Sequence, residues 1–138
     1  MAEIILSNRM QALTDMVTPG TVITDVGCDH GFVSVYLVQK GISPRVIAMD
    51  VRSGPLEHAR EHIREYGLED RIETRLSDGL HSLKTGEAAG MICAGMGGPL
   101  MEKILTEGRE QAKGFRELIL QPQAEIPHFR TFLMEEGY

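Results

Sequence analysis

The chain has 138 residues, of which 42% are hydrophobic and 25% are charged. This length and composition fit one globular domain with a buried core and exclude a disordered tail. Its 14 basic and 20 acidic residues give a net charge of -6, which argues against a domain that grips nucleic acid by bulk electrostatics alone.

Individual residues exclude further classes of protein. Cys28 and Cys93 are the only cysteines, so a disulfide framework is excluded, and no closely spaced Cys or His pair predicts a metal site. No apolar run approaches the roughly 18 residues that a membrane span needs. Glu3, Asn8 and Arg9 interrupt the start of the chain, where a signal peptide would be apolar. We therefore expect a cytoplasmic protein with no membrane segment, no metal and two buried thiols.

Short apolar runs alternate with helical segments along the chain, and this alternation is typical of α/β architecture. Ser7 is expected to cap a first helix, with Met16 among its inward-facing residues, and Pro55 suits the first turn of a later helix. Helices are expected at about 7–17, 30–40, 55–66, 100–107 and 124–136, and strands at 22–26, 45–50, 71–76, 88–94 and 117–121. Such a chain predicts an open parallel sheet with helices on both faces.

The segment 24–31 runs from the first expected strand through a glycine turn into a helix, which is where an open α/β sheet binds a nucleotide. Gly27 is expected to make the sharp turn and Gly31 to let the helix approach the sheet. Asp29 stands where a dinucleotide-binding fold has a glycine beside the pyrophosphate, and its carboxylate would repel a diphosphate. The positive sulfonium and amino groups of S-adenosylmethionine suit this carboxylate. The alternative is that Asp29 only caps the helix.

Acidic residues also follow the next two strands. Asp50 ends the second expected strand near the offset of about 20 residues at which a carboxylate reaches ribose hydroxyls. Asp78, after the third strand, is expected to accept a hydrogen bond from an adenine amino group. The alternatives are a strand-end cap for Asp50 and a simple turn for Asp78. The predicted cofactor-binding residues are Asp25, Gly27, Cys28, Asp29, His30, Gly31, Asp50, Val51, Ser77, Asp78, Gly79, Ala94 and Gly95.

A glycine-rich segment at 94–99 follows the fourth expected strand and places bare backbone in the catalytic position of the sheet. Its glycines are expected to make room for a flat base beside the methyl donor, and simple loop flexibility is the alternative. The predicted catalytic residues in this segment are Gly95, Met96 and Gly97.

Six segments in this order resemble the bacterial TrmK family of tRNA (adenine(22)-N1)-methyltransferases: 6–10, 25–30, 54–55, 77–80, 94–98 and 118–122. The resemblance implies a Rossmann-like class I methyltransferase fold, S-adenosylmethionine as cofactor and tRNA as partner. It also implies that adenine N1 displaces the sulfonium methyl directly, so the main task of the enzyme is to align the two atoms. The target adenine is expected to leave its stack to reach the site. Within this resemblance Asp29 is a further predicted catalytic residue, whose carboxylate would stabilise positive charge that develops on the base, and a cofactor contact is its competing use.

The family resemblance also assigns residues to the RNA side of the site. Arg9 precedes the first helix close to the cofactor mouth, and His30 could contact the base, although a surface arginine and a helix-starting histidine are the alternatives. The predicted substrate-binding residues are Arg9, His30, Gly97, Gly98, Gln121 and Pro122.

Members of the family carry a closing pair of strands, numbers 6 and 7, and a C-terminal helical extension. This chain ends where the closing hairpin should begin, so we expect residues 1–138 to form one S-adenosylmethionine-binding domain truncated before it. The fifth strand would then keep an unpaired edge, through which a homodimer could form.

Three rival functions remain open at this stage. A methyltransferase acting on a small molecule or a protein would suit the negative charge. A catalytically silent module that binds cofactor or RNA would suit the missing C-terminal strands. A nicotinamide dehydrogenase is disfavoured because Asp29 occupies the phosphate-facing turn.

Overall fold

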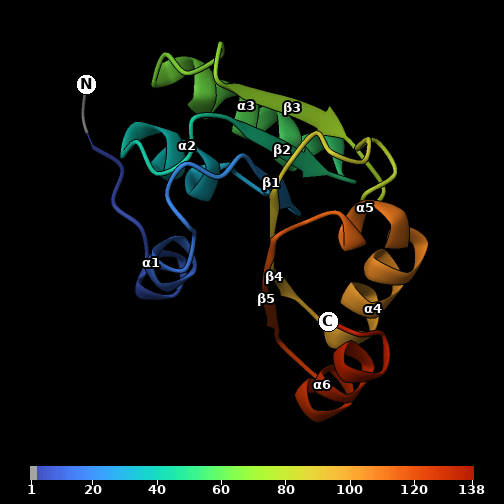
Figure 1. Cartoon of the computed structure of the whole chain (residues 1–138). Helices are drawn as coiled ribbons and strands as arrows, with labels where there is room; N and C mark the ends of the chain where they lie inside the picture. The colour runs from blue at the N-terminus through green and yellow to red at the C-terminus, as the bar shows by residue number, and fades with distance from the viewer. Residues whose placement is uncertain (1–2) are drawn as a thin grey trace.

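The computed structural model describes residues 3–138, which fold around an open five-stranded sheet of order β3-β2-β1-β4-β5 (Figure 1). Every neighbouring pair of strands is parallel, as predicted. The strands are β1 (Ile23–Val26), β2 (Val46–Asp50), β3 (Ile72–Leu76), β4 (Gly90–Met96) and β5 (Glu117–Pro122). The helices are α1 (Asn8–Asp15), α2 (Phe32–Gln39), α3 (Ser53–Glu65), α4 (Gly98–Glu107), α5 (Arg109–Lys113) and α6 (Ile126–Glu135).

Helices cover both faces of the sheet, and the apolar sequence of β2 explains how one strand can be buried on both faces. All five residues of β2 are buried. Val46 and Ala48 join a core cluster that includes residues of α1, α2 and α3, whereas Ile47 and Met49 join a second cluster that includes residues of α4, α5 and α6. Because successive side chains of a strand point to opposite faces, a continuous apolar run supplies both cores. The predicted Rossmann-like architecture is therefore confirmed.

Some element ends differ from the sequence prediction. Ser7 caps α1 as expected, its hydroxyl accepting a hydrogen bond from the Met10 amide at 3.3 Å. The helix stops at Asp15, however, and Met16 is 66% exposed, so placing Met16 on the buried side was wrong. Helix α5 was not predicted, because its five residues are too few to produce a helical periodicity.

The glycine turn before α2 differs from the simplest expectations. Gly31, with a φ of 79°, holds the N-cap position of α2, and Asp29 lies outside the helix with a φ of 52°. The alternative that Asp29 caps the helix is therefore wrong. Gly31 was expected to let the helix approach the sheet, but a Cβ added there would lie 3.0 Å from Cβ of Ala59 in α3. Its missing side chain instead permits close packing of the turn against α3.

Substituting Gly20 and Gly31 separates the energetic cost of close packing against α3 from the cost of backbone strain. Gly20 has a φ of 88° and nothing within 4 Å of an added Cβ, whereas Gly31 combines a φ of 79° with the contact to Ala59. Gly20→Ala is expected to lower the free energy of unfolding by about 1 kcal/mol through strain alone, and Gly31→Ala by about 2 kcal/mol. Urea denaturation measures both. Equal losses would show that α3 yields to the added methyl group.

Strand β5 lies at one edge of the sheet, which is the edge through which a homodimer is expected to form. Dimerisation itself stays a prediction.

Across residues 3–138, no helix combines the length and apolarity needed to cross a membrane.

Candidate active site

A cavity of about 530 Å³ lies at the carboxyl ends of the parallel strands, where an open α/β sheet places its ligand. Residues of the β1, β2, β3 and β4 ends line it, and α1 contributes to another wall. A volume of this size suits a nucleoside-sized molecule. Predicted site residues on the lining are Arg9, Asp25, Gly27, Cys28, Asp29, His30, Asp50, Val51, Ser77, Asp78, Gly79, Ala94, Gly95 and Met96.

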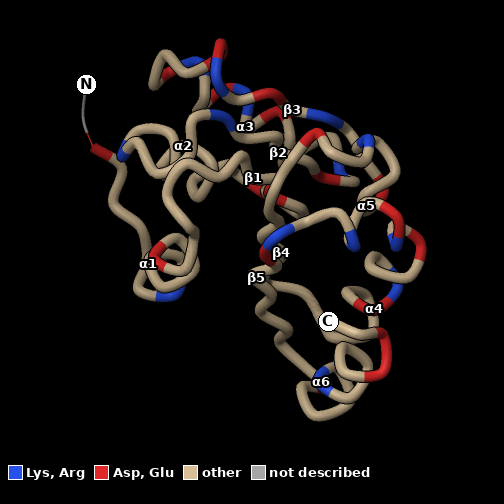
Figure 2. Tube along the Cα trace, in the orientation of Figure 1, with Lys and Arg blue, Asp and Glu red and all other residues tan. Residues whose placement is uncertain are grey.

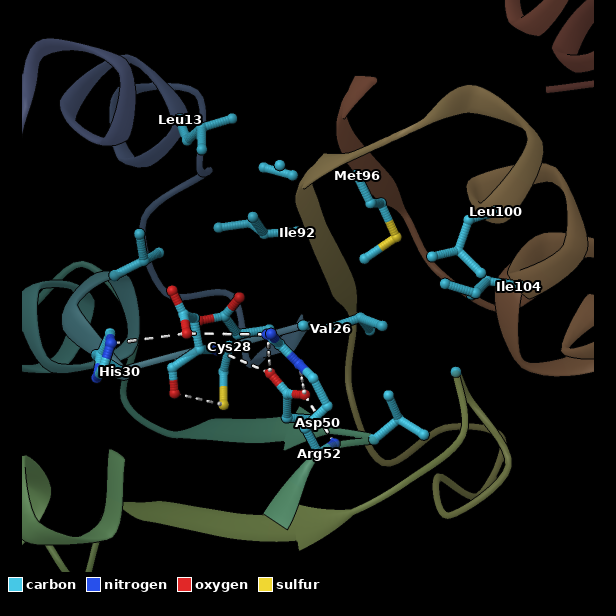
Figure 3. Close-up of a pocket in the computed structure, with 18 of the residues that line it drawn as sticks. Leu13, Val26, Cys28, His30, Asp50, Arg52, Ile92, Met96, Leu100 and Ile104 are labelled. Carbon is cyan, nitrogen blue, oxygen red and sulfur yellow. Dashed lines mark hydrogen bonds and ion pairs between the residues drawn. The ribbon is translucent and has the colours of Figure 1, made fainter. Parts of the chain in front are cut away.

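The glycine turn is fastened to the end of β2 by backbone hydrogen bonds. Gly27 takes a φ of 76°, and its amide donates to the Met49 carbonyl at 2.8 Å. The Asp29 amide donates to Oδ2 of Asp50 at 3.0 Å, and Figure 3 shows Asp50 and Cys28 together at the floor of the cavity. Two parts of the predicted site, separated by about 20 residues in the sequence, therefore share one hydrogen-bonded frame.

Asp25 is a buried carboxylate in the cavity wall, with 5% of its surface exposed. The pKa of Asp25 is raised to about 6 overall: burial is the largest cause, a hydrogen bond from the Ser34 hydroxyl opposes it, and the nearby Asp50 and Asp29 carboxylates add to the rise. The Ser34 oxygen lies 2.8 Å from Asp25 Oδ2. A cationic ligand in the cavity would favour the ionised form of this acid.

The two thiols are buried, as predicted. Cys28 lines the cavity, and burial raises the pKa of its thiol far above the ordinary value. Burial also raises the pKa of Cys93 to about 12. Since only a thiolate is strongly nucleophilic, neither cysteine is suited to covalent catalysis at neutral pH.

Acidic and basic residues are interspersed along the trace of the chain (Figure 2), and charged side chains gather at the mouth of the cavity around Asp29. Its Oδ1 lies 3.8 Å from both His30 Nε2 and Arg52 Nη2, and its side chain is 54% exposed. His30 also packs near Phe32, with ring centroids 6.0 Å apart. Asp29 and His30 are thus positioned beside solvent, where a large substrate could reach them.

The predicted catalytic loop enters the cavity only in part. The pairing of β4 with β5 shifts between Ala94 and Met96, and Gly95 at this irregularity takes a φ of 78° with no atom within 4 Å of an added Cβ. Gly95 and Met96 line the cavity. Other predicted residues lie off its lining within residues 3–138: Gly31, Gly97, Gly98, Gln121 and Pro122.

Gln123 connects this loop to α1. Its backbone amide donates to the Met96 carbonyl at 2.9 Å. In the amide orientation that satisfies both of its polar atoms, the side chain donates to the Gly95 carbonyl at 3.2 Å and accepts from Arg9 Nη1 at 3.1 Å. Arg9 lies in the first turn of α1, so its expected place before the first helix was wrong. The side chain is held against the loop rather than left as an isolated surface arginine.

Comparison with known proteins agrees with this geometry. The family profile described as "Methyltransferase domain" matches residues 6–138. The chain belongs to this methyltransferase-domain family. The methyltransferase domain is 36% identical over 138 residues to the tRNA (adenine(22)-N(1))-methyltransferase of Bacillus subtilis, covering 100% of this chain and 58% of that protein.

Solved structures place the methyltransferase domain in the same group. It matches the crystal structure of the B. subtilis m1A22 tRNA methyltransferase TrmK with a TM-score of 0.89 and 35% identity, covering 97% of this chain and 57% of that one. It also matches a Streptococcus pneumoniae protein in complex with S-adenosyl-L-methionine, with a TM-score of 0.93 and 33% identity, covering 96% of this chain and 63% of that one. The predicted resemblance to the TrmK family is confirmed, and the domain spans about three fifths of the length of these relatives.

The methyltransferase domain has further lining residues that sequence reasoning missed. Most are apolar side chains from α1, α2, α4 and the strands, which were expected to pack in the core or, for Met10 and Val26, lay in family-like segments without a predicted binding role. Arg52 and Gln123 follow motif residues by one or two positions, which was the only signal available. The missed lining residues are Met10, Leu13, Val26, Phe32, Val33, Arg52, Ile92, Leu100, Ile104 and Gln123.

The prediction that the methyltransferase domain holds no metal remains untested. Within residues 3–138, the exposed side chains of Asp78, His81 and Glu107 bring ligand-type atoms within 4.8 Å of one another. His81 Nε2 lies 3.1 Å from Glu107 Oε1, which is a common arrangement for an ordinary surface pair.

Proposed function

We propose that this domain binds S-adenosylmethionine in the cavity and transfers its methyl group to N1 of an adenine in tRNA, with nucleotide 22 as the target. The observation that carries the cofactor assignment is the charge of the cavity wall. Four carboxylates, Asp25, Asp29, Asp50 and Asp78, line it against two arginines, Arg9 and Arg52. This excess of negative charge favours a sulfonium and an ammonium group over a diphosphate.

Different carboxylates of the cavity suit different groups of the cofactor. Asp50 is fixed by backbone amides at the end of β2, where a carboxylate reaches ribose hydroxyls. Asp78 is exposed at the end of β3, where it can accept from an adenine amino group. Asp25 and Asp29 supply negative charge near the turn after β1. The complex of the S. pneumoniae relative with S-adenosyl-L-methionine supports this assignment.

Bound S-adenosylmethionine supplies the methyl group as an electrophile. The protein's part is to hold the adenine beside it, since direct displacement requires alignment and no protein nucleophile. Gly95 leaves open space at the β4 bulge, and the loop is tied to Arg9 through Gln123. Asp29 is exposed at the mouth, where its carboxylate would stabilise positive charge on the methylated ring. The names of the relatives support tRNA as the substrate, and such a substrate implies a cytoplasmic location.

Isothermal titration calorimetry tests the cofactor assignment. S-adenosylmethionine and S-adenosylhomocysteine are expected to bind saturably, and NAD is expected to show no saturable heat because the cavity acids repel its diphosphate. Tighter binding of NAD than of S-adenosylhomocysteine would overturn the assignment.

Methyl transfer tests the substrate assignment separately. Labelled methyl groups are expected to enter an unmodified tRNA transcript at adenine 22 and to be absent from the same transcript with guanine at that position. Lysate protein and small metabolites are the comparison substrates. Cofactor binding without transfer to any RNA would favour a silent module, and labelling of protein or metabolites would favour the other methyltransferase class.

A further inference from the structure

Arg52 covers the side of Asp50 that faces the cavity. Asp50 is 2% exposed, whereas the Arg52 side chain is 62% exposed, and both residues line the cavity. Asp50 Oδ1 accepts from the backbone amide of Arg52 at 2.9 Å and from its Nε at 3.2 Å. Asp50 Oδ2 accepts from the Asp29 amide at 3.0 Å and from Arg52 Nη2 at 3.5 Å. Each carboxylate oxygen therefore has one backbone donor and one donor from the guanidinium, as the dashed lines in Figure 3 indicate.

This arrangement leaves no acceptor position on Asp50 for a ligand. A carboxylate accepts about four hydrogen bonds, and all four positions are filled in this structure. The two backbone donors are part of the frame that joins the glycine turn to β2. The two guanidinium donors belong to a side chain that can move. A ribose presents two neighbouring hydroxyl groups, which would need the same two positions that the Arg52 fork occupies.

We propose that Arg52 is an internal competitor for the ribose site, and that a ligand must bring a vicinal diol to displace its guanidinium from Asp50. The proposal rests on the proposed function, in which Asp50 receives the cofactor ribose. Arg52 thereby becomes a specificity-determining residue, because a ligand without both hydroxyls cannot replace the two hydrogen bonds that it breaks.

The surroundings of Arg52 make this exchange feasible. The Arg52 side chain is 62% exposed although Asp50 is buried, so water can reach the guanidinium and the pair is weaker than a fully buried one. A guanidinium keeps its proton at neutral pH, so the Arg52 side chain stays cationic whether or not it is bound to Asp50. Asp29 Oδ1 lies only 3.8 Å from Arg52 Nη2, and it offers the displaced guanidinium a second carboxylate at the mouth of the cavity. The displaced charge therefore keeps a partner.

Adenosine and 2′,3′-dideoxyadenosine distinguish this role from a general effect on the cavity. Arg52→Gln is expected to bind adenosine about threefold to tenfold more tightly than the unmodified protein does. Its affinity for dideoxyadenosine is expected to equal that of the unmodified protein. Arg52→Lys keeps the positive charge but loses the two-pronged guanidinium. Its adenosine affinity is expected to lie between those of the unmodified protein and Arg52→Gln. Arg45→Gln is the matched control, because Arg45 precedes the other end of β2, is also exposed and pairs with the Glu73 carboxylate. This substitution should change the affinity for neither adenosine nor dideoxyadenosine.

Salt provides a second measurement that needs no variant. Adenosine is neutral, so added salt acts mainly on the Arg52 and Asp50 pair. Adenosine affinity of the unmodified protein is expected to rise between 0.05 M and about 0.5 M NaCl, while that of Arg52→Gln stays constant.

The outcomes separate this inference from the proposed function. If S-adenosylhomocysteine fails to bind the unmodified protein, the proposed function is wrong. If it binds, and Arg52→Gln weakens adenosine or strengthens dideoxyadenosine as much as adenosine, Arg52 does not compete for the ribose site. Thermal unfolding of each variant confirms that it is folded at the titration temperature.

Discussion

Asp50→Ala is expected to weaken S-adenosylhomocysteine binding about 30-fold to 150-fold, which corresponds to about 2–3 kcal/mol. Two hydrogen bonds from the ribose to a charged acceptor would be lost. The substitution also frees the Asp29 amide and the Arg52 guanidinium, both of which Asp50 now holds. The glycine turn therefore loses its tie to β2 at the same time as the ribose loses its acceptor. Calorimetric titration measures the effect.

A matched variant separates the loss of the site from the loss of a charge. Asp70 is an exposed acid outside the cavity lining, so Asp70→Ala changes the net charge equally. It is expected to leave binding unchanged. Asp50 would be removed from the ribose site if Asp50→Ala, folded by circular dichroism, bound S-adenosylhomocysteine as tightly as the unmodified protein.

Asp25→Asn is expected to stabilise the fold by about 2–3 kcal/mol above pH 7 and to lose most of this advantage near pH 4. The pKa of Asp25 is raised from 3.8 to about 6 in the folded protein, so the folded state holds this proton more tightly than the unfolded chain. The free energy of unfolding therefore falls as the pH rises from about 4 to about 6, and the loss is complete above that range. An asparagine does not titrate, and its side-chain oxygen can still accept from Ser34.

Urea denaturation between pH 4 and pH 8 measures this difference. The expected curve for Asp25→Asn lacks the decline that Asp25 contributes, whereas acids remote from Asp25 affect both proteins alike. An advantage of the same size at pH 4 and pH 8 would mean that packing, not ionisation, distinguishes the two side chains. The variant is also expected to bind S-adenosylmethionine less tightly relative to S-adenosylhomocysteine, because only the former carries a sulfonium charge.

The sequence was sufficient for the sheet and for the position of its ligand site. Alternating apolar and helical segments predict a parallel sheet, and parallel strands bring their carboxyl ends to one edge. Asp25, Asp50 and Asp78 each stand near the end of an expected strand, so they could be placed together without coordinates. The structure confirms that all three line one cavity.

Short-range patterns were less informative about helix ends and glycine contacts. Met16 continues the apolar pattern of α1 but lies beyond its last turn, where the pattern no longer reports burial. Gly31 was recognised as a site of close approach, yet its partner proved to be Ala59, which is 28 positions away on α3. A glycine indicates that space is needed and does not identify the neighbouring atom.

The sequence by itself thus determined which functional features follow which strand: the glycine turn, the acidic strand ends and the glycine loop. These features depend only on residue type and on position within an element. Only the tertiary structure decided which donors occupy those acids. The Arg52 guanidinium on Asp50, the Ser34 hydroxyl on Asp25 and the Gln123 amide between Arg9 and Gly95 are contacts set by side-chain direction and by packing between elements. Residue spacing along the chain does not fix such directions. They depend on the side-chain conformation within a loop, as for Arg52, and on separate elements meeting in space, as for Ser34 and Gln123.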